Sequence, residues 1–460
     1  MKNIKILSTL FAFLIMFSCE DKLELQPAQS LSVSESLGDL DGLFTGLIGA
    51  YDELQDVNYY GRDQVVINEV RADNVYISIN NSNRFLNDFR YEYRANATQL
   101  AFWGDAYSLI LRVNNILQNI DAAEGTQTDK DQIAGEALFL RAITHFDLVK
   151  TFALPYGEGA GNPGVPVMLE PSISEPARNT VGEVYAQVIA DLIEAKNLIT
   201  EDNGPYRATD DACDALLARV YLYMEDYANA EASASAVIGA GYTLFDGTDL
   251  ATFWGTHGTS EEIFTIRRLA NETLGSDNLG QIFNPQGYGD IRVSNDLINV
   301  YEAGDRRAAV DYYNQDGFNW VGKYLSQEGN PGLTNNKVFR LAEMYLIRAE
   351  ARLLKASPDA AGALADLDAV RTRAGLPSAG TATLAAIKQE RRVELAFEGH
   401  RALDIFRWGD AVTRIACGAG GTGDELNAPC FLAADSPLRI YPIPQQELDV
   451  NQNMTQNPGY

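Results

Sequence analysis

The sequence predicts a mainly α-helical protein, in which helical pairs of the tetratricopeptide type form a scaffold that irregular, loop-rich insertions interrupt. Three observations predict this fold. Apolar residues recur at spacings of three and four through much of the chain. Such stretches come in pairs separated by short turns, as in helical repeats. The segments between them are rich in Gly, Asn and Pro and have no long apolar period.

The helical stretches are expected at residues 37–54, 101–120, 131–152, 180–198, 210–224, 227–238, 339–355, 359–374 and 384–406. The fourth of them begins with Thr180 and Glu183 at the spacing of a capping box, in which each side chain accepts a hydrogen bond from the other residue's backbone N–H. The fifth and sixth show the repeat pattern most clearly, because small residues such as Ala218 and Ala230 allow two helices to approach. We therefore expect stacked helical hairpins.

Residues 56–99 and 241–335 interrupt this pattern. The first segment is rich in Asn, Asp, Tyr and Arg, and the second in Gly and Asn. We expect loops with short strands, one of them over 262–267. Loops held on a rigid scaffold often carry binding residues, so these segments are expected to form a loop-rich second face.

The N-terminus has the features of an export signal. Lys2 and Lys5 precede an apolar stretch over 6–17, which is shorter than the about 20 residues that a membrane-spanning helix needs. Cys19 follows at once and resembles the acylated cysteine of a bacterial lipobox; ordinary signal-peptide cleavage is the alternative. We expect residues 1–18 to be a lipoprotein signal peptide, Cys19 to be lipidated, and residues 19–36 to form an extended tether.

Three cysteines remain beyond Cys19. Cys213 lies among small apolar residues and is expected to be buried. An exported chain meets oxidising conditions, which favours a disulfide between Cys417 and Cys430 around a Gly-rich segment. Closing such a short loop would stabilise the fold by about 3 kcal/mol. No cysteine pair has the spacing of a zinc site, and neither a metal ion nor a cofactor is expected.

The charge and the missing motifs exclude several classes of protein. A formal net charge of -27 argues against nucleic acid and anionic lipid as partners, since both would be repelled. Membrane attachment is therefore expected only through a lipid anchor. No metalloprotease, Walker or serine-hydrolase motif is present. Motifs do not exclude a pair of carboxylates for glycoside hydrolysis, since the 63 acidic residues offer many pairs. We expect a protein that is not an enzyme and has no catalytic residues.

Several stretches resemble the signature sequences of one family. They are 339–353 (FRLAEMYLIRAEARL), 390–410 (ERRVELAFEGHRALDIFRWGD), 441–460 (YPIPQQELDVNQNMTQNPGY), 137–156 and 180–195. On these residues the chain is identified as a member of the SusD/RagB family, the surface glycan-binding lipoproteins of Bacteroidetes.

The resemblance covers nearly the whole chain and implies a SusD-like domain over 37–460, with an N-terminal part over about 37–240 and a C-terminal part over about 241–460. It implies a lipoprotein anchored on the outer face of the outer membrane. There it would capture oligo- or polysaccharide and deliver it to a SusC-like TonB-dependent transporter. The acidic Glu20 and Asp21 resemble the surface-export signal of such lipoproteins. The alternative function is a peptide-binding or structural lipoprotein that uses the helical scaffold as a protein dock.

The charged residues of 390–410 are interpreted as structural. Their spacing suits ion pairs along a helix and between helices, while the apolar residues among them pack inward. They are Glu390, Arg391, Arg392, Glu394, Glu398, Arg401 and Arg407.

A sugar ring has apolar C–H faces and a fringe of hydroxyl groups, so its site needs aromatic faces beside amides, carboxylates or guanidinium groups. The segments 72–94 and 280–292 supply this mixture. The candidate ligand-binding residues are Asp73, Asn74, Tyr76, Asn80, Arg84, Phe85, Tyr91, Phe283, Gln286 and Tyr288. Tyr91 alternates with Tyr93, so one of the two is also a candidate for a strand core. Trp320 is the tryptophan expected to reach the site.

Overall fold

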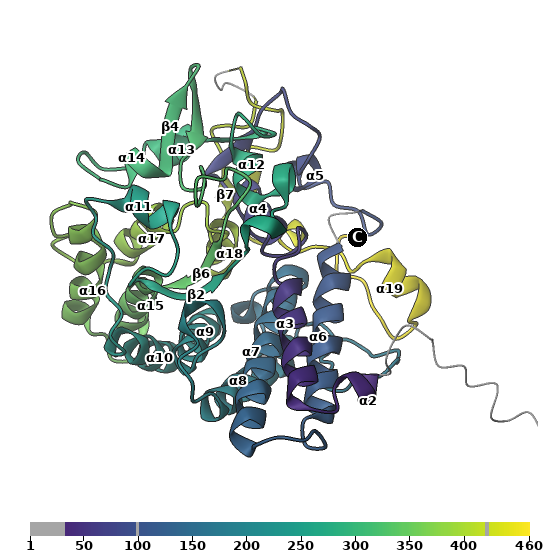
Figure 1. Cartoon of the computed structure of the whole chain (residues 1–460). Helices are drawn as coiled ribbons and strands as arrows, with labels where there is room; N and C mark the ends of the chain where they lie inside the picture. The colour runs from purple at the N-terminus through teal and green to yellow at the C-terminus, as the bar shows by residue number, and fades with distance from the viewer. Residues whose placement is uncertain (1–32, 98–100, 419–422) are drawn as a thin grey trace, which may run out of the picture.

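The helical scaffold follows the apolar spacing of the sequence closely in the computed structural model, which describes residues 33–97, 101–418 and 423–460. Its helices are α3 (Leu40–Glu53), α6 (Ala101–Asn119), α7 (Gln127–Phe152), α8 (Val181–Leu198), α9 (Asp210–Tyr223), α10 (Tyr227–Gly239), α15 (Leu341–Leu354) and α16 (Ala360–Arg373). The fold is therefore mainly α-helical, as predicted. Figure 1 shows these helices along the bottom and the lower left of the molecule.

Neighbouring scaffold helices pack as pairs, chiefly α7 with α8, α9 with α10 and α15 with α16. Ala218 and Ala230 are fully buried where α9 and α10 meet. The predicted capping box of α8 is confirmed, since Thr180 N donates to Glu183 at 2.8 Å and Glu183 N donates to the Thr180 hydroxyl at 3.2 Å. These local signals fix where the helices begin and how closely they approach.

The predicted helix over 384–406 is wrong in one respect, because it is two helices, α17 (Leu384–Glu394) and α18 (Arg401–Arg407). The chain breaks between them at Phe397 and Gly399, whose φ angles are 69° and 80°. Glycine is required at the second position, since a Cβ there would lie 2.9 Å from the Cα of Val65. The turn brings α18 against α4 (Asp63–Val70).

Helix α4 corrects the prediction of loops and short strands over 56–99. All residues from Gln64 to Val70 are buried, and at eight residues the helix is too short for its apolar positions to be told from those of a buried strand. The expected tether over 19–36 also needs correction at its end. Residues 33–36 form the short helix α2 (Val33–Ser36), with Glu35 in its first turn, where a negative charge is favourable.

Four two-stranded antiparallel sheets are present in the described residues: β1 (Val75–Ile77) with β3 (Ile291–Val293), β2 (Glu262–Ile266) with β6 (Asn336–Arg340), β4 (Tyr312–Gln315) with β5 (Phe318–Val321), and β7 (Val412–Thr413) with β8 (Phe431–Leu432). The strand predicted over 262–267 is confirmed as β2. The short helices are α5 (Leu86–Arg90), α11 (Leu250–Gly255), α12 (Leu279–Phe283), α13 (Asn295–Ile298), α14 (Ala308–Asp311) and α19 (Gln445–Val450). Single 3-10 turns occupy Tyr156–Glu158, Gly204–Tyr206, Ala270–Glu272, Gly275–Asp277 and Pro437–Arg439.

Three hydrophobic clusters organise the described elements, the smallest of them formed by Leu346, Leu367 and Ile387 of α15, α16 and α17. The largest contains Leu47 and Val237 from the N-terminal part and Phe339 and Tyr441 from the C-terminal part, so both parts share one core. The second lies beneath the loops and includes Tyr76, Phe283 and Phe397. Figure 1 shows α5, α12, β4 and β7 grouped at the top, away from the scaffold.

The charged residues of 390–410 form buried ion pairs, as predicted. Glu394 binds Arg340 at 2.5 Å and Arg307 at 2.9 Å, and it also pairs with Arg373. Burial alone would raise the pKa of Glu394, but Arg373, Arg340 and Arg307 hold it well below its usual value. Arg391 pairs with Asp404 at 2.7 Å, and Arg407 with Glu350 at 2.6 Å. These pairs join α17 to α16, β6 and α18, and α18 to α15.

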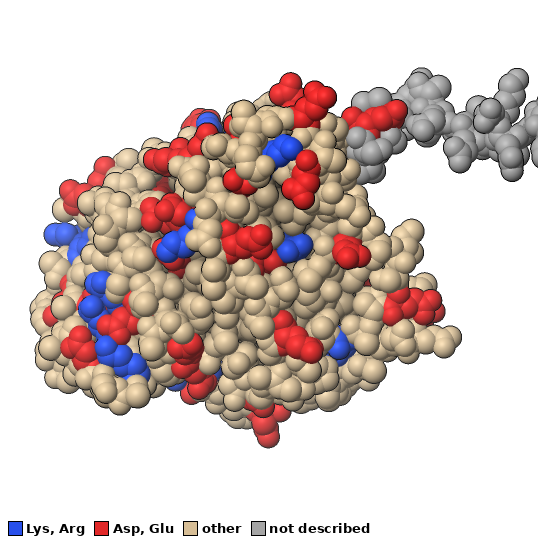
Figure 2. All heavy atoms as spheres, turned by 90° about the horizontal axis from the view of Figure 1, so that it is seen from below, with Lys and Arg blue, Asp and Glu red and all other residues tan. Residues whose placement is uncertain are grey.

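The surface carries the excess of acid. Figure 2 shows the underside of the molecule, where acidic side chains are scattered over a mostly uncharged surface and basic side chains are fewer. In the described part of the chain, no helix is both long and apolar enough to cross a membrane. The expected signal peptide and the lipidated Cys19 lie outside the described residues.

Candidate functional site

The two segments predicted to hold the site lie side by side. Strands β1 and β3 pair antiparallel, with Tyr76 opposite Arg292. Beyond β1, the backbone N–H of Ser82 donates to the Asp290 carboxylate at 2.8 Å, and the Ser82 hydroxyl donates to the same group. The loop that follows β1 is thereby fixed to the loop that precedes β3.

Direct contact between these loops occurs at Arg84 and Tyr288. The Arg84 guanidinium lies 3.5 Å from the centroid of the Tyr288 ring and its Nη2 lies 3.5 Å from Asp277. Phe85 is next to Arg84 and carries a φ of 56°, a conformation that is rare and strained for a bulky side chain. Arg62 lies over the Phe85 ring at 5.3 Å and helps to hold it. We call the candidate ligand-binding residues of these two loops that are partly or fully exposed the loop platform: Asn80, Arg84, Phe85, Gln286 and Tyr288.

The β4–β5 hairpin adds a second aromatic wall. Arg292 stacks on Phe318 at 3.6 Å and on Trp320 at 4.8 Å. Phe318 is partly exposed, whereas Trp320 is only 5% exposed. Trp320 therefore does not present the free ring that was expected at the site, and instead packs against Arg292. The sequence prediction did not include this hairpin, although Asp316 and Gly317 between alternating aromatic residues are a strong hairpin signal.

Asp424 is a further residue that the sequence prediction missed. Its carboxylate pairs with Arg292 and accepts hydrogen bonds from the hydroxyl groups of Tyr76 at 3.2 Å and Ser78 at 3.1 Å. Its backbone oxygen accepts from Ile79 N at 2.7 Å, so this segment lies along β1. No short motif marks Asp424, because its role depends on contacts with residues more than a hundred positions away.

A disulfide between Cys417 and Cys430 closes the segment that carries Asp424, with the two Cα atoms 5.1 Å apart. Ala428 N donates to the Cys417 carbonyl at 3.2 Å, and Leu426 N donates to the Ile77 carbonyl at 2.8 Å. The bridge therefore holds the segment against the strand at the base of the loop platform. Cys213 is fully buried, as expected.

Half of the candidate ligand-binding residues are buried and do not belong to the loop platform. They are Asp73, Asn74, Tyr76, Tyr91 and Phe283, none of which is more than 7% exposed. Asp73 is held by Arg401, and Asn74 by Arg392 and Glu69. Phe283 lies in the core beneath the loops, and Tyr91 and Tyr93 both lie in the main core. Burial leaves these side chains no free face for a sugar ring.

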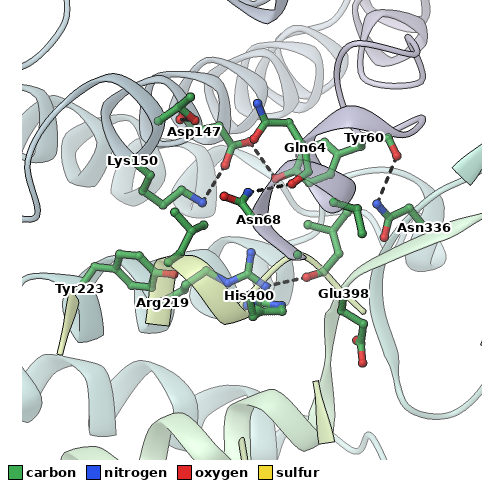
Figure 3. Close-up of a pocket in the computed structure, with 15 residues that line it drawn as sticks. Tyr60, Gln64, Asn68, Asp147, Lys150, Arg219, Tyr223, Asn336, Glu398 and His400 are labelled. Carbon is green, nitrogen blue, oxygen red and sulfur yellow. Dashed lines mark hydrogen bonds and ion pairs between the residues drawn. The ribbon is translucent and has the colours of Figure 1, made fainter. Parts of the chain in front are cut away.

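The molecule also contains a small polar cavity of about 30 Å³, drawn in Figure 3. Polar contacts line its walls. Lys150 pairs with Asp147 at 2.8 Å, and Asn336 Nδ2 donates a hydrogen bond to the Tyr60 carbonyl at 3.2 Å. Burial lowers the pKa of Lys150 and lowers the pKa of His400 well below its usual value. This volume suits two or three water molecules and is far too small for a sugar ring, so the cavity is not a glycan site.

Comparison with known proteins places the chain among relatives. The model of the SusD family matches residues 307–460, and a model described as starch-binding associating with outer membrane matches residues 23–222. The chain is 27% identical to SusD-like protein P2 of Formosa agariphila, with all of both chains covered. A structure from Bacteroides vulgatus, given as a candidate sugar binding protein, is 30% identical, with a TM-score of 0.86 over 92% of this chain and 99% of that one. A laminarin binding SusD-like protein is 26% identical, with a TM-score of 0.74 over 92% of this chain and 100% of that one.

Proposed function

The chain belongs to the SusD/RagB family of carbohydrate-binding proteins, which are not enzymes, and we propose that it binds glycan on the loop platform and delivers it to a SusC-like TonB-dependent transporter. The observation that supports this most is the junction of Arg84 and Tyr288. It combines an aromatic ring with a planar array of donors, beside Phe85 and the Gln286 amide. Sugar recognition needs that combination.

The loop platform suits an extended ligand better than a small enclosed one. Its residues come from surface loops, and Phe318 on the adjoining hairpin extends the aromatic surface beside it. An open row of aromatic and polar side chains lets a chain of sugars pass over the surface. We therefore place an oligo- or polysaccharide there, with Tyr288 and Phe85 against C–H faces and Arg84 and Gln286 toward hydroxyl groups.

Cys19 would tether the protein to the outer leaflet of the outer membrane, with the platform facing away from the lipid. Replacing Cys19 by Ala should release the protein or leave it unprocessed, which fractionation and mass spectrometry of the N-terminus would detect. A variant that stays lipidated and surface-attached would contradict this anchor.

The transporter would dock on the helical scaffold, whose stacked pairs offer a broad surface. Stable complexes of this kind bury at least about 2,000 Å². Purification from mild detergent extracts should therefore recover a large TonB-dependent receptor with the protein. Recovery of the protein alone in every extract would contradict the delivery step while leaving glycan binding intact.

A glycan array followed by isothermal titration with the best binder tests the glycan itself. A peptide pull-down run in parallel distinguishes the alternative of a peptide-binding lipoprotein. The proposal fails if peptides bind and no glycan does.

A further inference from the structure

A groove of about 440 Å³ lies on the surface formed by α17, α18 and the residues that follow them. Among its lining residues are Lys388, Gln389, Arg392, Arg401, Trp408 and Asp410. We infer that this groove is a subsite for an oxyanion, namely a carboxylate or sulfate group carried by an acidic saccharide. The inference rests on the proposed function in that it adds a ligand class to the glycan that the loop platform binds.

The arginines are held in place by groups behind them. Arg401 donates to Asp73 through Nε at 2.7 Å and Nη2 at 2.9 Å. Arg392 donates through Nε to the Asn74 side-chain oxygen at 2.9 Å, and its Nη2 lies 3.2 Å from Asp73. Each guanidinium thus keeps its Nη1 without a hydrogen-bond partner among the described residues, on a side chain that stays 13% or 15% exposed. Donors that are fixed before the ligand arrives lose little entropy when it binds.

Lys388 supplies an adaptable third cation. Its Nζ pairs with Asp410 at 2.6 Å and lies 4.6 Å from the centroid of the Trp408 ring. Its side chain is 23% exposed and that of Asp410 49% exposed, so this pair is near the surface and is worth little by itself. An incoming carboxylate or sulfate can take the place of Asp410 beside Lys388.

The charge of the residues that line the groove is opposite to that of the whole protein. Among the lining residues, the cations Lys388, Arg392 and Arg401 outnumber the one acid, Asp410. Asp73 pairs with both arginines, and Asp296 and Asp404 also interact electrostatically with Arg392 and Arg401, respectively. The chain as a whole carries -27. A local excess of cations on an acidic protein selects anions by position, since the surrounding surface repels them.

Size and shape favour a saccharide over a free ion. The volume lies within the roughly 300–1,000 Å³ range of small-molecule sites. Val300, Ile405 and Trp408 also line the groove and give it apolar surface that a bare anion would not use. A sugar ring with one anionic substituent matches this lining, because its C–H faces can contact the apolar residues and its anionic group can bind the cationic ones.

The test is isothermal titration of the purified protein with trigalacturonate and with glucose 6-sulfate. Lys388→Ala should weaken binding of the anionic probe by about fivefold, because one charge-assisted hydrogen bond is lost. Asp410→Asn should strengthen it by about twofold to fivefold, because the competing acid is removed. The matched control is Lys355→Ala. Lys355 pairs with Glu231 at the same 2.6 Å and is 25% exposed, so its loss should leave the affinity unchanged.

Several outcomes overturn the subsite: no binding of either probe, affinities that neither Lys388→Ala nor Asp410→Asn changes, or an equal loss with Lys355→Ala. Inorganic sulfate binding as tightly as glucose 6-sulfate would overturn the saccharide part. Loss of trigalacturonate binding in Tyr288→Ala would place the acidic sugar on the loop platform instead, which contradicts the subsite and leaves the proposed function standing. Conversely, a neutral glycan that depends on Tyr288 and not on Lys388 supports the proposed function whatever the anionic probes do.

Discussion

The guanidinium of Arg84 lies 3.5 Å from the centre of the Tyr288 ring, and this contact joins the two loops of the proposed glycan site. Tyr288→Ala removes the ring and also the surface that orients Arg84. We expect glycan binding to weaken by about 1–3 kcal/mol, the range for losing an aromatic anchor. Isothermal titration with the glycan found by array measures it.

Tyr345→Ala is a suitable control for Tyr288→Ala. Tyr345 is also partly exposed and lies beneath an arginine, Arg348, at 5.6 Å, but on scaffold helix α15. The Tyr345→Ala variant should bind the glycan with the affinity of the wild type. If both tyrosine variants bind like the wild type while folded, the glycan lies on another face.

Phe283 tests the distinction between the platform and the core beneath it. It is 1% exposed and lies beneath the loops, so Phe283→Ala should destabilise the fold by about 3–5 kcal/mol. Phe283→Leu keeps most of the volume and should cost less than about 1.5 kcal/mol. Urea unfolding gives both values. Glycan affinity of the folded Phe283→Leu variant should match the wild type, and a large loss of affinity would mean that Phe283 contacts the ligand.

The Asp73 carboxylate accepts two hydrogen bonds from Arg401. Asp73→Ala leaves both Arg401 and Arg392 without their buried partner, so we expect destabilisation of about 3–5 kcal/mol. Burial alone would raise the pKa of Asp73, but Arg401 and Arg392 lower it below its usual value. The pair therefore stabilises the fold above the ordinary aspartate pKa, and this contribution is lost as the pH falls below about 4. Thermal unfolding at pH 7 and pH 3 should show a smaller difference between wild type and variant at pH 3.

The scaffold was predictable because its information is local. Helix spacing, the Thr180–Glu183 capping box and the small residues of α9 and α10 each act within a few turns of one helix. Helix α4 was missed because its eight residues are too few to separate a helical period from a short buried strand. The break before α18 depends on the approach of Gly399 to Val65, a contact between distant segments that no local pattern records.

The composition of the two segments indicated where the candidate site lies, but it did not indicate which of their side chains are exposed. The segments 72–94 and 280–292 do meet, yet the residues of each divide between the surface and the core. Tyr76 and Tyr288 have the same side chain, and only the pairing of β1 with β3 and with the segment of Asp424 decides that the first is buried. Sequence reasoning could not rank them, because both partners of Tyr76 lie more than two hundred residues away.

The disulfide gives a prediction about the base of the platform. Cys417→Ser with Cys430→Ser opens a loop of sequence separation 13, which should lower the free energy of unfolding by about 3 kcal/mol. Urea unfolding with and without dithiothreitol measures this. The wild type should become as unstable as the variant when reduced, and the variant should not respond. Equal stability of wild type and variant without reductant would mean that the bridge contributes nothing.

Glu69 gives a pH dependence with a defined sign. Its carboxylate is fully buried and accepts hydrogen bonds from Gly399 N at 3.0 Å and from the Asn74 amide at 3.3 Å. Burial raises the pKa of Glu69 to about 7 from 4.5, against smaller opposing effects of these donors and of Lys323. Between these two pH values the folded state keeps a proton that the unfolded state has lost. The free energy of unfolding contributed by this group therefore falls as the pH rises from about 4.5 to 7.

Glu69→Gln removes that titration. The variant is also expected to lose a constant amount of unfolding free energy at every pH, because the Gln amide would oppose the Asn74 donor. The quantity to measure is therefore how the difference in unfolding free energy between variant and wild type changes with pH. From pH 5 to pH 7.5, the free energy of unfolding of the variant should rise by roughly 2–4 kcal/mol relative to that of the wild type, since each pKa unit corresponds to about 1.4 kcal/mol. Urea unfolding of both proteins across this range gives the difference. A difference that stays constant over the range would mean that Glu69 is already ionised in the folded protein at pH 5, and that the hydrogen bonds from Gly399 and Asn74 outweigh its burial.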